Sequence, residues 1–418
     1  MFRLKSTYDT CYRSAVSQPD PVRDRDAPVN LRRLGRLRVL EALSDAGELS
    51  RTELVRRTGL SRSTVSSVVY DLIGEGLVGE QSGGTTEAKL GRPPLTVSLE
   101  PRAAYAVGVD IGHDHVRTIL SDLAGSPVWD DNIGIDVDDS VHDTLDAATK
   151  SLDRALHERS IRRSAVLGVG VGIACPVDRQ TGELYAEGIM RNWVGVKPGD
   201  ELAARTGLRV RVINDANACV LAERSYGAAR VWDDVVYIRL SAGIGAGIVC
   251  DGRMLLGNDG LSGELGHVTV EPNGVFCRCG NRGCLETVAS PTAIAALLSR
   301  SRDRAVTTTE LVGLIQQRDR SAVRAVADGG DAIGRALAMT VMTLNPRLIL
   351  VGGELAYAGD LLLDPIRRSL ERNTVGSHNR QLEISIGSLG DAAAARGAAA
   401  LVLADAPQLL NEPAVHQP

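Results

Sequence analysis

The sequence predicts a two-lobed α/β domain preceded by a small all-α domain with a winged helix-turn-helix. Three observations support this fold class. Residues 31–75 carry three helical patterns, with a glycine turn between the second and the third. From residue 103 onward, strand patterns alternate with helical ones, which is typical of α/β proteins. The strand, glycine turn and strand of residues 107–120 recur at 235–256, which indicates two related halves.

The composition limits the possible functions. A chain of 418 residues is long for a single core, so we expect more than one domain. The net charge of −5 means that any contact with nucleic acid must be local, and 3% aromatic residues argue against single-stranded nucleic acid. We find no apolar run long enough to span a membrane and no signal-peptide pattern. With seven cysteines, the chain fits a reducing cytoplasm.

The pattern along the chain predicts two domains between two tails. Residues 1–30 lack periodicity and are predicted to be a mobile tail, and residues 406–418 a second tail. Between them we expect a winged helix-turn-helix at 31–100 and the two-lobed domain at 101–405.

A helix-turn-helix is predicted from three helices in a row. The first ends near Gly47 and carries four leucines that we predict on one side: Leu34, Leu37, Leu40 and Leu43. The second, at 51–58, is capped by Ser50, and Gly59 makes the turn that follows. The third begins after Ser61 and has an apolar inner face: Val65, Val68, Val69 and Leu72. This spacing is that of a helix-turn-helix.

The outer face of the third helix is suited to the major groove of DNA, because its side chains are mostly short and form hydrogen bonds. They are Arg62, Ser63, Thr64, Ser66, Ser67 and Tyr70. Residues 77–100 predict two strands around a polar tip, a wing, in which Arg92 would reach a narrow minor groove. We expect a palindromic operator, since such proteins usually bind double-stranded DNA as symmetric dimers. The alternative is a helical dimerisation module.

The second domain is predicted to have strands within 103–112, 115–125 and 165–177, followed by further strands after 209, 345 and 381. Its weak internal duplication resembles the actin-like and sugar-kinase fold, which is ribonuclease H-like and has two lobes hinged around a cleft. Ligands bind at the carboxyl ends of strands that face such a cleft.

Residues 263–290 gather the donors of a metal site. His267, Cys277, Cys279 and Cys284 supply the Cys₃His set of a closed, structural zinc site. A disulfide fits poorly, because a CxC pair is badly placed to close on itself. The alternative is that the three cysteines are simply buried as small apolar side chains.

The same stretch resembles the signature of the ROK family, which contains transcriptional repressors and sugar kinases. The matching residues are ELGH at 264–267 and CRCGNRGCLE at 277–286, and the resemblance extends over about residues 30–405. It implies that the Cys₃His set holds zinc and that Glu264, His267 and Glu286 reach a sugar. We call residues 264–286 the zinc loop.

The family's NDANA motif stands at 214–218 and adds Asn214 and Asp215 to the sugar-contacting set. In a kinase the aspartate would be the general base, whereas in a binding protein it accepts a hydrogen bond from a sugar hydroxyl. The alternative is that both residues only cap the helix that follows.

The two phosphate loops differ from those of the kinases. Where the kinases resemble DxGGT, this chain reads DIGHD at 110–114, so Asp114 adds negative charge where phosphate would lie. In the second loop, Ala242 replaces a threonine. We therefore expect no kinase activity, and we predict a repressor of carbohydrate genes that responds to a sugar as a homodimer or homotetramer. The alternatives are a sugar kinase that also binds DNA and a regulator that has lost sugar binding.

Overall fold

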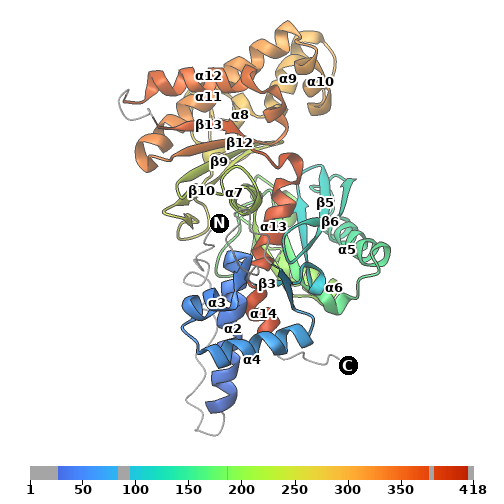
Figure 1. The fold of residues 1–418 in the computed structure, drawn as a ribbon. Coiled ribbons are helices and arrows are strands. Elements are labelled where there is room, and N and C mark those ends of the chain that lie inside the picture. Colours follow the sequence, from blue (N-terminus) through green and yellow to red (C-terminus); the bar gives the residue numbers. More distant parts are fainter. Residues whose placement is uncertain (1–26, 83–94, 186, 376–380, 413–418) are drawn as a thin grey trace.

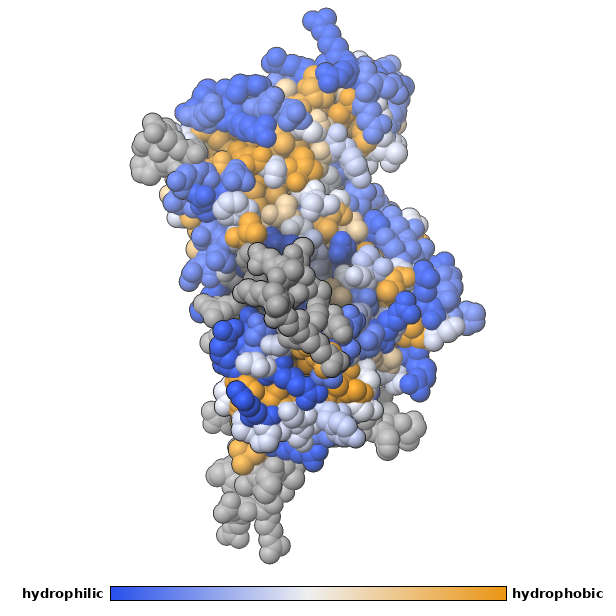
Figure 2. All heavy atoms as spheres, viewed as in Figure 1, coloured by the Kyte–Doolittle hydropathy of each residue, from blue (hydrophilic) through white to orange (hydrophobic). Residues whose placement is uncertain are grey.

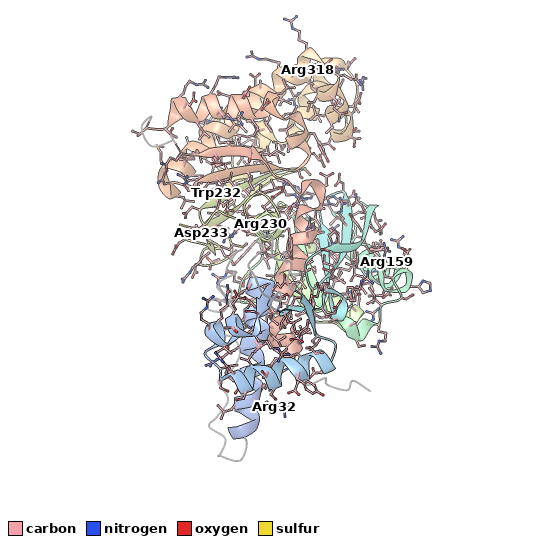
Figure 3. The ribbon with its side chains drawn as sticks, in the orientation of Figure 1. Arg32, Arg159, Arg230, Trp232, Asp233 and Arg318 are labelled. Carbon is pink, nitrogen blue, oxygen red and sulfur yellow. The ribbon has the colours of Figure 1, made fainter. Side chains whose placement is uncertain are left out.

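A computed structural model describes residues 27–82, 95–185, 187–375 and 381–412, with side chains from residue 31. The chain folds into a winged helix at one end and two α/β lobes, with two helices packed between the lobes (Figure 1). Figure 3 shows how far the molecule extends, since Arg32 lies on the winged helix and Arg318 at the far end of the second lobe.

The winged helix consists of three helices and a three-stranded antiparallel sheet in the order β1-β3-β2. Its helices are α2 (Ala27–Ala46), α3 (Arg51–Thr58) and α4 (Arg62–Gly74), and its strands are β1 (Glu48–Ser50), β2 (Val78–Ser82) and β3 (Leu95–Leu99). Ser50 and Glu53 form a capping box on α3, and Gly59 ends that helix at φ 70°, where a glycine meets no steric penalty. The helix-turn-helix is therefore confirmed.

Details of the winged helix differ from the prediction. Helix α2 begins at Ala27, inside the predicted tail, and β1 was not predicted. Leu34 is 46% exposed, whereas Leu40 and Leu43 are buried together with Val39. Residues three apart are offset by about 60° on a helix, so four such leucines cannot share one face. The wing tip and Arg92 lie outside the described residues.

The first lobe is a five-stranded sheet in the order β6-β5-β4-β7-β8. Its strands are β4 (Tyr105–Ile111), β5 (His115–Asp122), β6 (Pro127–Gly134), β7 (Val166–Ile173) and β8 (Val210–Asn214). Helices α5 (Val141–Glu158) and α6 (Pro198–Thr206) accompany it, with short 3₁₀ turns η2 (Pro101–Ala103), η3 (Arg163–Ala165) and η4 (Arg191–Trp193).

The second lobe repeats this plan with the order β11-β10-β9-β12-β13. Its strands are β9 (Val235–Leu240), β10 (Ile244–Cys250), β11 (Arg253–Met254), β12 (Leu348–Gly352) and β13 (Glu383–Ile386). Its helices are α8 (Glu286–Ala289), α9 (Pro291–Arg302), α10 (Thr308–Gln316), α11 (Arg320–Leu344) and α12 (Asp360–Asn373), with 3₁₀ turns η5 (Leu265–His267) and η6 (Glu354–Ala358).

Both sheets combine the same pairings, which confirms the predicted duplication. In each, the first strand pairs antiparallel with the next and parallel with a later one, as β4 does with β5 and β7, and β9 with β10 and β12. The parallel strands end at one edge of each sheet, so the two edges can face a shared cleft.

Helices α7 (Asp215–Tyr226) and α13 (Ala393–Leu403) pack between the lobes, and a 3₁₀ turn η7 (Gly390–Ala392) precedes α13 (Figure 1). Glycines allow the close approach. A Cβ at Gly170 would stand 1.8 Å from the carbonyl oxygen of Ala398, and one at Gly397 1.7 Å from that of Ala218. A larger residue at either glycine would push α13 away from the sheet or from α7.

The predicted tail beyond residue 405 is helical in its described part. Helix α14 (Ala406–Asn411) lies against α2 of the winged helix, and Leu410 packs on the winged-helix core. The prediction missed it because the apolar partners of this short helix are nearly 370 residues away, as in the hydrogen bond from Gln408 to Glu41.

No helix in the described part of the chain is long and apolar enough to cross a membrane. In the view of Figure 2 the surface is mainly hydrophilic, with apolar areas over the second lobe and the winged helix.

Candidate functional site

A cleft with about 600 Å³ of empty volume opens between the lobes. It is lined by the end of β8, the loops after β4 and β9, and the zinc loop. All five residues predicted to contact sugar line this one cleft: Asn214, Asp215, Glu264, His267 and Glu286. They come from both lobes, so a ligand bound here would contact both.

In the cleft, Arg239 of β9 in the second lobe forms hydrogen bonds with two carboxylates, those of Asp110 in the first lobe and of Asp215 in α7. Its guanidinium donates to Oδ2 of Asp215 at 2.8 Å and to the two oxygens of Asp110 at 3.3 and 3.2 Å. Arg239 is 8% exposed and Asp110 fully buried. His115 approaches Asp110 with Nε2 at 3.3 Å and Asp114 with Nδ1 at 2.8 Å.

These contacts set the charges in the cleft. Burial alone would raise the pKa of Asp110, but Arg239 and His115 outweigh it and lower that pKa to about 2. Burial disfavours a charged His115, yet its hydrogen bonds with Asp110 and Asp114 raise its pKa to about 9. Burial raises the pKa of Asp215, and the Arg239 guanidinium opposes that shift. At neutral pH, two cations thus flank Asp110.

Asn214 and Asp215 have different local roles. Oδ1 of Asn214 accepts hydrogen bonds from the backbone N–H groups of Ala216 and Asn217, so this residue caps α7 while it lines the cleft. Asp215 is the first residue of α7 and turns Oδ2 toward Arg239. The cap that we considered as an alternative therefore exists for Asn214, and a carboxylate in the cleft exists beside it.

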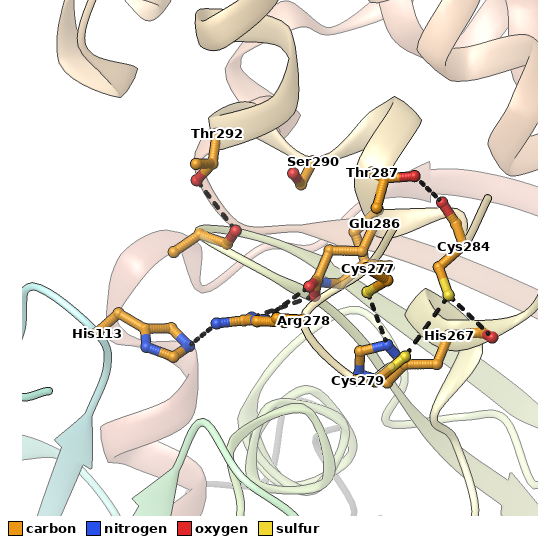
Figure 4. Close-up of polar contacts among 12 residues, drawn as sticks. His113, His267, Cys277, Arg278, Cys279, Cys284, Glu286, Thr287, Ser290 and Thr292 are labelled. Atoms are coloured by element: carbon orange, nitrogen blue, oxygen red, sulfur yellow. Dashed lines mark hydrogen bonds and ion pairs between the residues drawn. The ribbon is translucent and has the colours of Figure 1, made fainter. Parts of the chain in front are cut away.

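Glu286 and Arg278 form a second ion pair in the cleft (Figure 4). Arg278 Nε donates to Glu286 Oε1 at 2.9 Å, and its far end lies 3.4 Å from Nε2 of His113 in the first lobe. Glu286 also accepts the backbone N–H of Ile244 at 3.1 Å. The zinc loop is thereby held to both lobes.

Glu264 also lines the cleft and is half-buried. Burial, together with the charges of Asp215 and Glu286, raises its pKa to about 7. Among the described residues, the one ion pair of Glu264 is with His267, whose Nε2 is 4.0 Å away, and it has none with an arginine or lysine. It is therefore the predicted sugar contact most open to a ligand.

The four predicted metal donors come together, and their ligand atoms all lie within 4.8 Å of one another. Nδ1 of His267 is 3.6 Å from Sγ of Cys277, and Sγ of Cys279 is 3.7 Å from Sγ of Cys284 (Figure 4). Donors about 2.3 Å from a tetrahedral zinc ion are about 3.8 Å apart, so these separations fit such a site. Burial lowers the pKa of His267, which favours the neutral ring that a metal requires.

A second cavity with about 770 Å³ of empty volume adjoins the first, and Arg239 lines both. It is lined by His115, Arg117, Asn132, Gly353 and Asp391, among others. Asp114 of the altered first phosphate loop lines both cavities. In the second phosphate loop, the carbonyl oxygen of Ala242 accepts a hydrogen bond from the Thr292 hydroxyl of α9 at 3.0 Å, which holds that loop against α9.

The face of α4 predicted to contact DNA is open to solvent. Its side chains are all exposed: Arg62, Ser63, Thr64, Ser66, Ser67 and Tyr70. The hydroxyls of Ser63 and Thr64 lie 2.9 and 2.8 Å from that of the capping Ser61, which orients the N-terminal end of the helix. The inner face is buried as predicted.

Sequence reasoning missed Arg239, Arg278 and His115. The signal for Arg239 was present, because it is the single charged residue in VVYIRL, a strand that is otherwise apolar. A buried arginine requires anionic partners, so its position in that strand points to carboxylates nearby.

Known proteins resemble the chain over both domains. The sequence model described as the ROK family matches residues 106–405, and the one described as the MarR family matches residues 30–84. A putative xylose repressor of Caldicellulosiruptor is 28% identical over 391 residues, which is 90% of this chain and 96% of that protein.

Two solved structures extend the comparison. The crystal structure of a ROK family transcriptional regulator, described as a homolog of the E. coli Mlc protein, matches with a TM-score of 0.74 at 25% identity. The match covers 91% of this chain and 98% of that one. A ROK glucokinase from Streptomyces griseus, solved with glucose and AMPPNP, matches with a TM-score of 0.64 at 28% identity and covers 71% of this chain and 99% of its own.

Proposed function

The chain belongs to the ROK family, and from this premise we propose that it is a DNA-binding repressor of carbohydrate genes that responds to a sugar bound between its lobes. The observation that carries the proposal is the combination of two sites in one chain. A helix-turn-helix with an exposed polar face precedes a cleft that gathers the five predicted sugar contacts. Similarity to a xylose repressor and to a ROK regulator over nine-tenths of the chain supports the repressor over a kinase.

The cleft suits a polyol. Asp215, Glu264 and Glu286 supply acceptors, Nδ2 of Asn214 can donate, and Nε2 of His267 can donate or accept according to its tautomer. The hydroxyls of a sugar bound here would replace some of the hydrogen bonds that Arg239 and Arg278 now make with Asp215 and Glu286. Each hydroxyl bound to a charged group contributes roughly 1.5–3 kcal/mol.

We propose that the Cys₃His set holds a structural zinc ion, for which the donor separations are suitable. Zinc would fix the zinc loop, and so fix Glu264, Arg278 and Glu286 relative to the cleft. His267 would contact both ligands, because Nδ1 lies beside Cys277 while Nε2 faces Glu264.

The sugar signal would reach DNA through the helices between the lobes. Helix α7 begins at Asp215 in the cleft and packs on α13, which leads to α14 on the winged helix. Closure of the lobes around a sugar would move this chain of helices and change the spacing of two winged helices in a dimer. A 100-fold change in operator affinity requires only about 2.7 kcal/mol of preference for one state.

Operator binding with and without sugar tests this function. Purified protein would select its operator from random double-stranded DNA, and a thermal-shift screen over sugars would find the effector. The expected result is that this sugar changes operator affinity in the wild type but not in Glu264→Ala, which still binds DNA. The control is Glu271→Ala, since Glu271 lies in the same loop but is exposed and does not line the cleft. A normal sugar response in Glu264→Ala would contradict the assignment of this cleft.

The alternative is a ROK sugar kinase that also binds DNA, which the likeness to a glucokinase keeps under test. We expect no turnover with Mg-ATP and hexoses, because Asp114 and Ala242 stand in the loops that would hold phosphate. Turnover above about 1 per second that is lost in Asp215→Ala would make the protein an enzyme.

A further inference from the structure

Arg239 lines both the sugar-side cavity and the second cavity of the cleft, together with Asp114, His115, Ser241 and Glu354. The Arg239 side chain cannot swing aside at little cost, because three of its hydrogen bonds end on the buried carboxylates Asp110 and Asp215.

The two carboxylates have the chemistry of a site for a divalent cation. Hard cations such as Mg²⁺ bind carboxylate oxygens, and phosphoryl transfer depends on such an ion to hold phosphate. Asp110 and Asp215 come within hydrogen-bonding distance of the same nitrogen, Nη1 of Arg239. That nitrogen therefore lies where one cation could bridge both residues.

A guanidinium differs from a metal ion because it is covalently part of the chain, so it cannot be exchanged or removed. Most of its N–H donors are already directed at Asp110, Asp215 and Ser241, which leaves few for a phosphate oxygen. Nε2 of His115 also forms a hydrogen bond with Asp110, so this carboxylate has partners on both Arg239 and His115.

We propose that Arg239 is a built-in cation that takes the place of a divalent metal ion between Asp110 and Asp215. On this proposal, the effector binds in the sugar-side cavity without metal or nucleotide. This role rests on the proposed function, but it concerns one residue whose effect can be measured without sugar or DNA.

The test measures Mn²⁺ binding to the full-length protein by electron paramagnetic resonance, with thermal shift as a second readout. We expect no Mn²⁺ site in the wild-type cleft. Arg239→Ser should gain a site that binds Mn²⁺ roughly tenfold or more tightly than anything in the wild type. Adding Asp110→Asn to that variant should remove the gain. Arg239→Lys is the matched control, because it keeps a cation and should gain nothing.

Arg239→Gln replaces the serine variant if the latter does not fold, since its amide still donates to one carboxylate. Failure of either folded variant to gain a site overturns the proposal. A wild-type Mn²⁺ site that is lost in Asp110→Asn alone also overturns it, and that measurement needs no Arg239 variant. None of these results bears on how operator binding responds to sugar, so this proposal and the proposed function can fail separately.

Discussion

Arg36 of α2 donates a hydrogen bond to the backbone carbonyl of Leu410 in α14 at 3.2 Å, while its other nitrogen pairs with Glu75 just after α4. One side chain thus contacts the DNA-binding helix pair and the last described helix of the sugar-binding domain. Helix α14 follows α13, which packs between the lobes. Arg36 therefore provides a continuous path of contacts from the lobes around the cleft to the end of α4.

Leu410→Asp should uncouple the two domains. The half-buried leucine packs on the winged-helix core, and a carboxylate there would face apolar surface. We expect operator binding to persist but to lose most of its response to sugar, as measured by gel shift with and without effector. Glu412→Gln is the control, since Glu412 pairs with the exposed Arg209 and does not touch the winged-helix core. An unchanged sugar response in Leu410→Asp would place the coupling elsewhere.

Cys279→Ser should remove the metal and destabilise the zinc loop. Loss of one thiolate from a four-donor set lowers zinc affinity, and binding in such a loop is coupled to its folding. Elemental analysis should fall from about one zinc per chain to a small fraction, with a lower melting temperature. Cys250→Ser, outside the cluster, should change neither. Wild-type protein that is folded without zinc would show that the cysteines are only packing residues.

His115 should give the protein a pH-dependent contribution to stability. Its pKa is raised to about 9 in the fold, above its ordinary value of 6.5, so its contribution is complete below 6.5 and is lost as pH rises through about 9. Urea unfolding of wild type and His115→Gln should therefore differ at pH 6 and converge near pH 10. A difference that stays constant over this range would mean that His115 does not become charged on Asp110.

Arg62→Ala should weaken operator binding by roughly 1–3 kcal/mol and change base preference, since Arg62 is exposed at the N-terminal end of α4. Fluorescence anisotropy against a set of single-base operator variants would measure both effects. Arg318→Ala is the control, because Arg318 lies at the far end of the second lobe (Figure 3). If both variants bind every operator equally, α4 does not read bases.

The parts of this protein that the sequence determined by itself are those governed by short-range rules. Serine caps, the turn at Gly59 and the 3.6-residue period placed α3 and α4 correctly. The grouping of the four candidate metal donors was also predictable, because His267 to Cys284 lie in one loop and their ligand atoms come together in the fold. The prediction for Leu34 was wrong, because residues spaced by three along a helix do not all lie on one face.

Only the tertiary structure determined which charged residues far apart in the sequence come into contact. Asp110, Asp215 and Arg239 come from β4, α7 and β9, and nothing in their spacing along the chain predicts that one guanidinium joins the two carboxylates. The strand order in the two sheets and the packing of α13 between them bring these three residues together, and they also place α14 against α2. Periodicity and caps act over a few residues, whereas the electrostatics of the cleft depend on distances across the whole fold, which only the folded chain defines.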